Sequence, residues 1–302
     1  MELWQALLLG LIEGLTEYLP VSSTAHLLIA QRWLGIESSA AANAYAIVIQ
    51  AGAIVAVLGL YRRRVGEIVL GVVGRHESGR RLLLGLLVAF VPAAIIGFVF
   101  DKPIERVLFG PWPIVVAWSI GGILLLVISP RLRARPGYAL EQLRPSAALW
   151  IGLAQCAALW PGVSRSMATI LGGIAVGLSL GSAVEFSFLL GLLTLGAATS
   201  YKALSSGALL LHTYGWPPLI VGFLSAWVAA VLAVRWMVNW LNQRGLGVFG
   251  WWRLIAAALV TMWLLRGPPP VPANSAPGDP LTRDPLTRDP LIRDAALRSG
   301  SS

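Results

Sequence analysis

Long runs of apolar residues, separated by short polar connections, make up most of this chain. A membrane-spanning helix needs roughly 20 consecutive apolar residues, and as few as about 17 can suffice. The best candidates for such helices are six runs: Asn43–Leu60, Leu82–Phe100, Pro113–Ser129, Glu185–Leu204, Pro217–Trp240 and Trp251–Leu265. The pattern therefore predicts an all-α polytopic membrane protein with six transmembrane helices.

Two further apolar regions, Leu3–Gly35 and Ala147–Leu178, fit poorly as simple spans. Each contains a glycine followed three residues later by Glu or Gln, then a proline, then a group of hydroxyl side chains. Such a break is tolerated at membrane depth only where protein buries the backbone or water reaches it. Each region is therefore predicted to form a re-entrant helical hairpin.

The predicted order is a hairpin and three spans, twice. Because three is odd, the second set enters the membrane from the opposite side, as in an inverted-topology repeat. We expect a first repeat over residues 1–146 and a second over residues 147–266. Residues 267–302 are rich in proline and repeat Asp-Pro-Leu-Thr-Arg, so they are predicted to form a disordered tail that cannot bury a core.

Composition supports a membrane protein and excludes several other classes. Charged residues make up 12% of the chain, against about 25% in an ordinary soluble domain, and the mean hydropathy is +0.74. The net charge of +9 comes mostly from arginines in short connections, which favours membrane topology over nucleic-acid binding. The single cysteine, Cys156, excludes an intrachain disulfide and a cysteine-based zinc site.

The arginines also predict the orientation of the chain. They gather in the connections Tyr61–Arg81, Pro130–Pro145 and Asn242–Arg253, whereas Asp101–Trp112 and Ser205–Trp216 are charge-balanced or nearly uncharged. The positive-inside rule puts the first three in the cytoplasm and the other two outside. The first hairpin then enters the membrane from outside and the second from the cytoplasm, with both termini outside.

The first hairpin carries the acidic residues. Glu13 and Glu17 are four apart, so on a helix they share one face. Two carboxylates among apolar neighbours repel each other unless a divalent cation or a basic group lies between them, or one is protonated. The alternative is a surface pair on an interfacial helix.

Hydroxyl side chains and a histidine follow Pro20, which is expected to end the first helix. Ser22, Ser23 or Thr24 can cap the next helix, and a helix N-terminus attracts anions. His26, early in that helix, can accept or donate a proton near neutral pH. The alternative is that the hydroxyls are ordinary N-caps and that the histidine packs in an interface.

The second hairpin repeats this design and adds a basic residue, in the run Ser164-Arg165-Ser166. Arg165 is a permanent, fork-shaped donor suited to phosphate oxygens, but between apolar stretches it is costly unless it is paired. The alternative to anion binding is a salt bridge, for which the candidate partners are Glu13, Glu17 and Glu185. Two hairpins from opposite faces would aim both helix N-termini at one cavity, a polyanion site with room for a metal. A serine near a histidine supplies a nucleophile and a base, so the set favours phosphoryl transfer from a lipid-borne or small phosphate.

Three motifs resemble a known family. They are Glu13-Gly-Leu-Thr-Glu17, Pro20-Val-Ser-Ser-Thr-Ala-His26 and Pro161-Gly-Val-Ser-Arg-Ser-x-x-Thr169, and they are similar to the signature motifs of the undecaprenyl-diphosphate phosphatases, the bacitracin-resistance protein family. The resemblance runs from about Leu3 to Leu265. It implies an enzyme of the bacterial inner membrane that removes the terminal phosphate of undecaprenyl diphosphate and uses a divalent cation.

The resemblance also implies roles for single residues. Ser23 would be the nucleophile, His26 would assist proton transfer, and Arg165 would hold the diphosphate. Glu13 and Glu17 would bind the metal, Mg²⁺ or Ca²⁺, or activate the nucleophile; which does which stays open, as does the choice between a phosphoserine and direct attack by water. The expected substrate-binding residues are Ser22, Thr24, Ser164, Ser166, Thr169 and Gln155.

The alternative hypothesis is that the chain is a transporter or lipid-phosphate flippase, because inverted repeats with broken helices bind anions at half-helix N-termini. The serine–histidine pair discriminates between the two, since transport needs no nucleophile. The expected partners are an isoprenoid diphosphate lipid and membrane lipids, without nucleic acid, and a homodimer stays open. The site is expected to face the periplasmic side.

Overall fold

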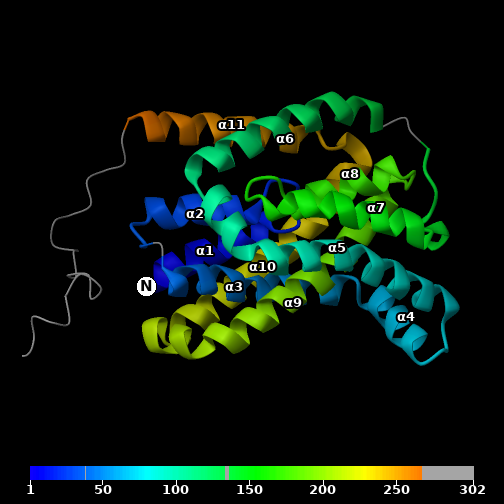
Figure 1. The fold of residues 1–302 in the computed structure, drawn as a ribbon, viewed down its shortest axis with the longest axis horizontal. Helices are drawn as coiled ribbons and strands as arrows, with labels where there is room; N and C mark the ends of the chain where they lie inside the picture. The colour runs from blue at the N-terminus through cyan, green and yellow to red at the C-terminus, as the bar shows by residue number, and fades with distance from the viewer. Residues whose placement is uncertain (38, 133–135, 267–302) are drawn as a thin grey trace, which may run out of the picture. The chain divides into compact units, whose positions relative to one another are not determined.

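The computed structural model describes residues 1–37, 39–132 and 136–266, and the expected tail 267–302 lies outside the described residues. Within the described ranges the regular elements are helices (Figure 1). Those of the first half are α1 (Leu3–Thr16), α2 (Ser23–Trp33), α3 (Ala40–Leu60), α4 (Arg62–Val72), α5 (Glu77–Leu108) and α6 (Pro111–Leu132). Those of the second half are η1 (Leu140–Gln142), α7 (Pro145–Cys156), η2 (Ala157–Leu159), α8 (Arg165–Ala175), α9 (Leu180–Tyr214), α10 (Trp216–Arg244) and α11 (Gly247–Leu265).

Six helices of the described chain are long and apolar enough to cross a membrane: α3, α5, α6, α9, α10 and α11. Each contains one of the six runs expected from the sequence, so the all-α class and the six candidate spans are confirmed. The helices extend beyond the apolar runs at their ends, because polar residues can continue a helix that an apolar run has started. In α5, for example, the apolar span ends at Phe100, where the backbone kinks, and the helix continues to Leu108.

The two regions that fit poorly as spans are each divided into two short helices. Residues 17–22 separate α1 from α2, and residues 160–164 separate η2, which extends α7, from α8. The first break comes earlier than expected, because α1 ends at Thr16 rather than at Pro20. Both breaks lie beside each other in the middle of the molecule (Figure 1).

Helices of the first half pack mainly on helices of the second half. α1 lies on α10, and α7 lies on α5. α3 packs against α9, and α6 packs against α11, which runs beside it along the top of Figure 1. Each pair therefore joins one element of the first half to one of the second.

Glycines at matching places let the two broken regions pack closely on these partners. A Cβ added at Gly10 of α1 would lie 3.0 Å from the Cα of Gly222 in α10. A Cβ added at Gly152 of α7 would lie 2.8 Å from the Cα of Ala89 in α5. The glycine of the repeated Gly-x-x-Glu/Gln pattern thus serves helix packing, since any side chain there would collide with backbone.

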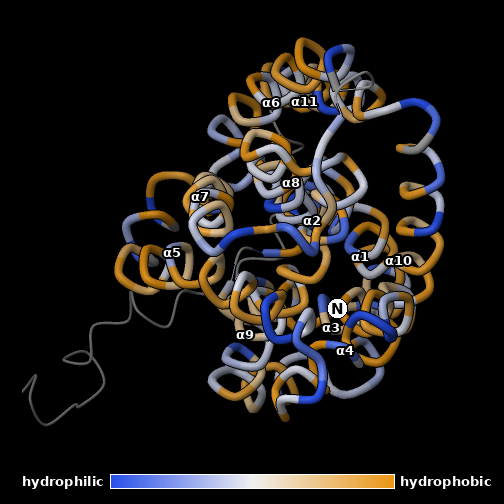
Figure 2. The backbone as a smooth tube through the Cα atoms, turned by 90° about the vertical axis from the view of Figure 1, so that its right-hand side faces the viewer, coloured by the Kyte–Doolittle hydropathy of each residue, from blue (hydrophilic) through white to orange (hydrophobic). Residues whose placement is uncertain are grey.

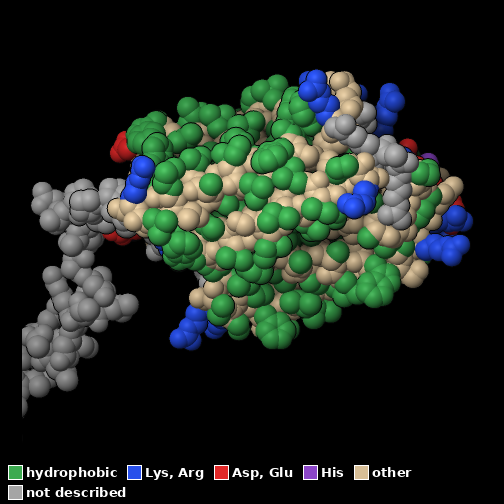
Figure 3. Space-filling view, turned by 90° about the horizontal axis from the view of Figure 1, so that it is seen from above, with side chains coloured by type: hydrophobic (Ala, Val, Ile, Leu, Met, Phe, Trp, Pro, Cys, Tyr) green, Lys and Arg blue, Asp and Glu red, His purple; other side chains and the backbone are tan. Residues whose placement is uncertain are grey.

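Apolar side chains cover the middle of the molecule, and polar residues gather toward its ends. Figure 2 shows hydrophobic residues along most helices, and Figure 3 shows green side chains over most of one face with lysine and arginine toward its edges. This distribution fits a protein surrounded by lipid, which solvates apolar side chains as well as a protein core does.

Two arginines assigned to the expected basic connections, Arg64 and Arg253, contact residues distant in the sequence. Arg64 bonds to Glu67 at 2.9 Å and to Glu141 and Glu185 at 2.6 Å, which ties α4, η1 and α9 together. Partial burial would lower the pKa of Arg64, but these hydrogen bonds outweigh burial and raise the pKa above its ordinary value. Arg253 was assigned to a basic connection, and that assignment is wrong: it lies inside α11 and is completely buried.

Candidate functional site

A polar cavity of about 150 Å³ lies where the two breaks meet. Its volume exceeds the roughly 30 Å³ share of one liquid water several times, so it can hold a small anion or several waters. The residues that line it come from both halves of the chain: Glu17, Ser22, Ser23, Thr24, Gln50, Ala158, Pro161, Ser164, Arg165 and Leu195. The expectation that one cavity joins the two breaks is met by this geometry.

The backbone turns sharply at a serine directly before α2 and directly before α8, the second helix of each broken region. Ser22 before α2 has φ 73°, and Ser164 before α8 has φ 76°; they are the only non-glycine residues with positive φ among the described ones. A non-glycine residue in this conformation costs of order 1–3 kcal/mol and persists only where the surroundings hold it. The hydroxyl of Ser164 caps α8 by accepting from the Met167 N–H at 3.2 Å. The hydroxyl of Ser22 instead accepts from the Gly162 N–H of the other turn at 3.0 Å.

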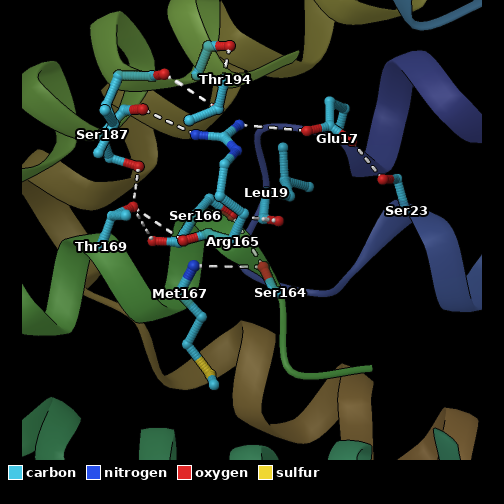
Figure 4. Close-up of polar contacts among 12 residues, drawn as sticks. Glu17, Leu19, Ser23, Ser164, Arg165, Ser166, Met167, Thr169, Ser187 and Thr194 are labelled. Carbon is cyan, nitrogen blue, oxygen red and sulfur yellow. Dashed lines mark hydrogen bonds and ion pairs between the residues drawn. The ribbon is translucent and has the colours of Figure 1, made fainter. Parts of the chain in front are cut away.

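Glu17 connects Ser23 to Arg165 (Figure 4). The Ser23 hydroxyl donates a hydrogen bond to Oε2 of Glu17, and Nη2 of Arg165 donates to Oε1 at 3.2 Å. All three side chains line the cavity, and both Glu17 and Ser23 are buried. A buried carboxylate is costly unless paired, and the guanidinium and hydroxyl supply that pairing. Of the three glutamates offered as partners of Arg165, the structure selects Glu17.

The guanidinium of Arg165 rests in a seat built mainly by α9. Nη1 donates to the carbonyl of Ser187 at 2.8 Å, and the guanidinium carbon lies 5.3 Å from the centre of the Tyr18 ring. Gly191 of α9 leaves the room for it, because a Cβ there would lie 2.6 Å from Nη1. Nε makes no hydrogen bond to the described residues, so this arginine retains a donor for a further acceptor.

Two of the expected substrate-binding residues, Thr169 and Ser166, make hydrogen bonds that stabilise the surroundings of Arg165. Thr169 is completely buried; its hydroxyl donates to the Arg165 carbonyl at 2.9 Å and lies 2.7 Å from the Ser187 hydroxyl. Ser166 is also completely buried and donates to the Leu19 carbonyl at 2.9 Å (Figure 4). Neither lines the cavity, whereas Ser22, Thr24 and Ser164 do.

His26 lies outside the cavity, in an aromatic setting. Its Nε2 accepts from the Trp252 indole N–H at 3.0 Å, so the proton belongs on Nδ1, which lies 2.7 Å from the Ser22 carbonyl oxygen. Its ring centre is 4.8 Å from that of Trp118. Both ring nitrogens are therefore engaged with partners other than Ser23. In this arrangement the base beside the Ser23 hydroxyl is Glu17.

The Gly-x-x-Glu and Gly-x-x-Gln positions are both buried and polar. Glu13 lies one helical turn before Glu17, and neither of its carboxylate oxygens accepts a hydrogen bond from a donor of the described chain. Neither polar atom of the Gln155 amide has a hydrogen-bond partner there, and both Glu13 and Gln155 lie outside the residues that line the cavity. Within residues 1–37, 39–132 and 136–266, no group of three or more acidic, cysteine or histidine side chains could hold a metal. Two carboxylates remain as possible ligands, and Mg²⁺ is commonly held by one or two carboxylates with substrate phosphates and water.

Comparison with known proteins places this chain in a family. The family model described as "Bacitracin resistance protein BacA" matches residues 6–259. The chain belongs to this bacitracin-resistance family. A protein of Sorangium cellulosum named undecaprenyl-diphosphatase is 45% identical over 265 residues, 86% of this chain and 86% of the relative. Undecaprenyl-diphosphatase 1 of Chromobacterium violaceum is 41% identical over 264 residues, 86% of this chain and 97% of the relative. The six apolar helices and this membership establish a multi-pass membrane protein.

Two polar residues of this bacitracin-resistance family member were missing from the expected site. Gln50 lines the cavity from α3, and the signal for it was an amide side chain alone within an apolar run. Arg253 bonds to the backbone of both turns from α11. Its position at the edge of a polar connection hid it, because a terminal arginine of an apolar run ordinarily faces the lipid headgroups.

Proposed function

We propose that this chain hydrolyses undecaprenyl diphosphate to undecaprenyl phosphate and inorganic phosphate, which regenerates the lipid carrier for peptidoglycan and gives resistance to bacitracin. The observation that carries the proposal is the hydrogen bond from Ser23 to Glu17 in a cavity that also contains Arg165. A hydroxyl with a carboxylate base beside it, opposite a guanidinium, suits phosphoryl transfer. The names of the relatives support the same activity.

In the proposed mechanism Glu17 activates Ser23. Glu17 takes the hydroxyl proton as the Ser23 oxygen attacks the terminal phosphorus. The bond from that phosphorus to the bridging oxygen breaks, and Glu17 passes the proton to the departing undecaprenyl phosphate. Water then attacks the phosphoserine and gives a proton to Glu17, which returns it to the Ser23 oxygen as inorganic phosphate leaves.

Arg165 is the proposed binding residue for the diphosphate. Its Nε–H makes no hydrogen bond among the described residues, so a phosphate oxygen that reaches it would leave the Ser187 and Glu17 contacts of the other two nitrogens unbroken. Held in this seat, the guanidinium stabilises the negative charge that develops on the equatorial oxygens in the transition state. Ser22, Thr24 and Ser164 contribute hydroxyl donors from the cavity wall.

Glu13 and Glu17 are the residues that would hold a divalent cation, Mg²⁺ or Ca²⁺, together with phosphate oxygens. The support is the pair of oxygens of Glu13, which are buried without a hydrogen-bond donor in the described chain. When bound, such a cation neutralises charge on the phosphoryl oxygens. Without it, two carboxylates one turn apart in a buried site repel each other.

The proposed architecture is an inverted repeat with two re-entrant hairpins, α1–α2 and α7–α8, in a bacterial inner membrane. Support comes from the helix pairs. If α7 is the counterpart of α1, and α10 that of α5, then the packing of α1 on α10 corresponds to the packing of α7 on α5. The basic connection at α4 supports a cytoplasmic position for that end of the molecule, and the cavity would then open to the periplasmic side. A reporter fused after Val72 tests the orientation, and an external reporter signal would contradict it.

The activity is tested with purified protein in detergent, undecaprenyl or farnesyl diphosphate, and added Mg²⁺ or Ca²⁺. We expect phosphate release by the wild type and a loss of at least about 10²-fold for Ser23→Ala and Arg165→Ala, since each removes a group that acts on the phosphorus. The matched controls are Ser205→Ala and Arg75→Ala, whose side chains are exposed away from the cavity. Unchanged phosphate release in both site variants would show the mechanism to be wrong.

Two further experiments distinguish covalent catalysis from direct attack by water, and a phosphatase from a flippase. Trapping a phosphoserine on Ser23 with labelled substrate would support covalent catalysis, and label transfer only to water would favour direct attack. A Ser23→Ala protein that no longer releases phosphate but still moves labelled lipid phosphate across vesicle membranes would favour transport.

A further inference from the structure

Arg253 makes an unusual set of contacts for an arginine in an apolar helix. Its side chain is completely buried, and its two terminal nitrogens donate to four backbone carbonyls. Nη1 donates to Pro20 and Val163, both at 3.1 Å. Nη2 donates to Ala117 at 3.0 Å and to Gly162 at 2.6 Å. All four N–H bonds of the two terminal nitrogens are therefore used.

Three of these carbonyls belong to the two breaks that lead into the site. Pro20 lies two residues before Ser22, and Gly162 and Val163 come directly before Ser164 and Arg165. One guanidinium thus joins two turns that are about 140 residues apart in the chain, and the Gly162 N–H to Ser22 bond joins them a second time. Because both turns contain a serine at positive φ, they keep their shape only if their surroundings hold them.

Arg253 also carries an uncompensated charge. None of the ion pairs found among the described residues includes it, and its acceptors are carbonyl dipoles. The four carbonyls solvate the guanidinium without neutralising it. A positive charge therefore remains next to the two turns, whose residues line the cavity. This charge would stabilise an anionic substrate bound in the cavity.

We infer that Arg253 is a positioning residue for the reaction: it ties the two turns together and so sets Ser23 and Arg165 in register across the cavity. This inference rests on the proposed phosphatase function. Arg253 itself contacts no cavity space, because it lies outside the lining, so it acts through the turns. An ammonium group cannot replace it, since a lysine has one nitrogen where the planar fork of arginine spans two pairs of acceptors.

Arg253→Lys tests the inference because it keeps the positive charge but leaves one terminal nitrogen in place of two, which cannot reach all four carbonyls. We expect kcat to fall at least about tenfold with KM changed less than about threefold, since displacing reacting groups by about 1 Å can cost 10²-fold while Arg165 keeps its own seat. Leu210→Ala is the control for lost stability, because it removes a buried side chain from a core cluster that includes no residue of either turn. It should lower the unfolding temperature and leave kcat unchanged.

Gly121→Ala displaces Arg253 without changing it. A Cβ at Gly121 of α6 would lie 2.6 Å from the guanidinium carbon of Arg253, so the side chain must move. We expect the same loss of kcat as for Arg253→Lys. Gly59→Ala in α3 is the matched control, because nothing lies within 4 Å of the added Cβ.

Hydrogen exchange supplies a readout that does not depend on activity. Amides of residues 18–24 and 160–166 should exchange faster together in Arg253→Lys, because one tie holds both turns. A folded Arg253→Lys protein with wild-type kcat, or with unchanged exchange in the two turns, would overturn the inference while leaving an active wild type as evidence for the phosphatase. A wild type that releases no phosphate would overturn the proposed function, and the catalytic part of this inference with it.

Discussion

Gly191→Ala should inactivate the protein without unfolding it. The added Cβ would lie 2.6 Å from Nη1 of Arg165 and 2.8 Å from its Cζ and Nη2, well inside normal contact. The guanidinium is the far end of a flexible side chain, whereas Gly191 is fixed in the middle of α9. Arg165 must therefore move, and it loses its 2.8 Å bond to Ser187 and its 3.2 Å bond to Glu17.

The expected magnitude follows from these contacts. Moving the guanidinium by about 1 Å takes the phosphate-binding group out of line, which can cost about 10²-fold in kcat/KM, or about 2.7 kcal/mol of transition-state stabilisation. The effect on folding has the opposite sign at the backbone, because alanine in a helix interior is favoured over glycine by about 0.5–1 kcal/mol. Loss of two hydrogen bonds made by a charged group, each worth about 1.5–3 kcal/mol, outweighs this gain, so the unfolding temperature should fall while the protein stays folded at the assay temperature.

The assay is steady-state phosphate release from farnesyl diphosphate, alongside thermal unfolding in the same detergent. Gly207→Ala, also in α9, is the control because its Cβ would meet nothing within 4 Å. It should keep full activity. If Gly191→Ala were as active as Gly207→Ala, the seat described for Arg165 would not be the one used in catalysis.

Three other substitutions test separate parts of the structure. Gly152→Ala brings a Cβ to 2.8 Å from the Cα of Ala89, which cannot rotate away, so we expect a loss of about 1–3 kcal/mol in unfolding free energy; an unchanged unfolding temperature would argue against close packing of α7 on α5. Arg64→Met removes the ion pairs that reach Glu185, which should cost about 1 kcal/mol with kcat retained, and a large loss of kcat would contradict a structural role. Gln50→Leu removes an amide from the cavity wall and should lower kcat/KM about tenfold at unchanged stability; full activity would exclude contact with substrate.

The spans and the breaks could be predicted from local patterns. An apolar run either is or is not long enough to cross a bilayer, and a proline followed by hydroxyl residues within such a run indicates a place where a helix can stop. A proline alone does not suffice, because Pro92 lies inside α5 without ending it. The motifs with Glu17, Ser23 and Arg165 were likewise visible, because ionisable residues in apolar sequence are costly and so stand out. The structure brings these three side chains into contact.

The division of roles among the polar residues was not predictable in the same way. His26 follows Ser23 by three positions and looked like its base, yet α2 turns the histidine toward Trp252 and leaves Glu17 beside the hydroxyl. Ser166 was expected to bind substrate, and it bonds to backbone of the other turn. Spacing along one helix gives the face of a side chain, but the partner on that face comes from another segment.

By itself, the sequence determined which segments are helices, where two of them break, and which ionisable groups the membrane region must accommodate, because these depend on length, period and local backbone chemistry. Only the tertiary structure decided that Arg253 holds both breaks and that Gln50 reaches the cavity. The physical reason is that a buried polar group is satisfied by whichever donors and acceptors helix packing brings to it. That packing depends on close approaches such as Gly10 on α10, which join parts of the chain far apart in sequence.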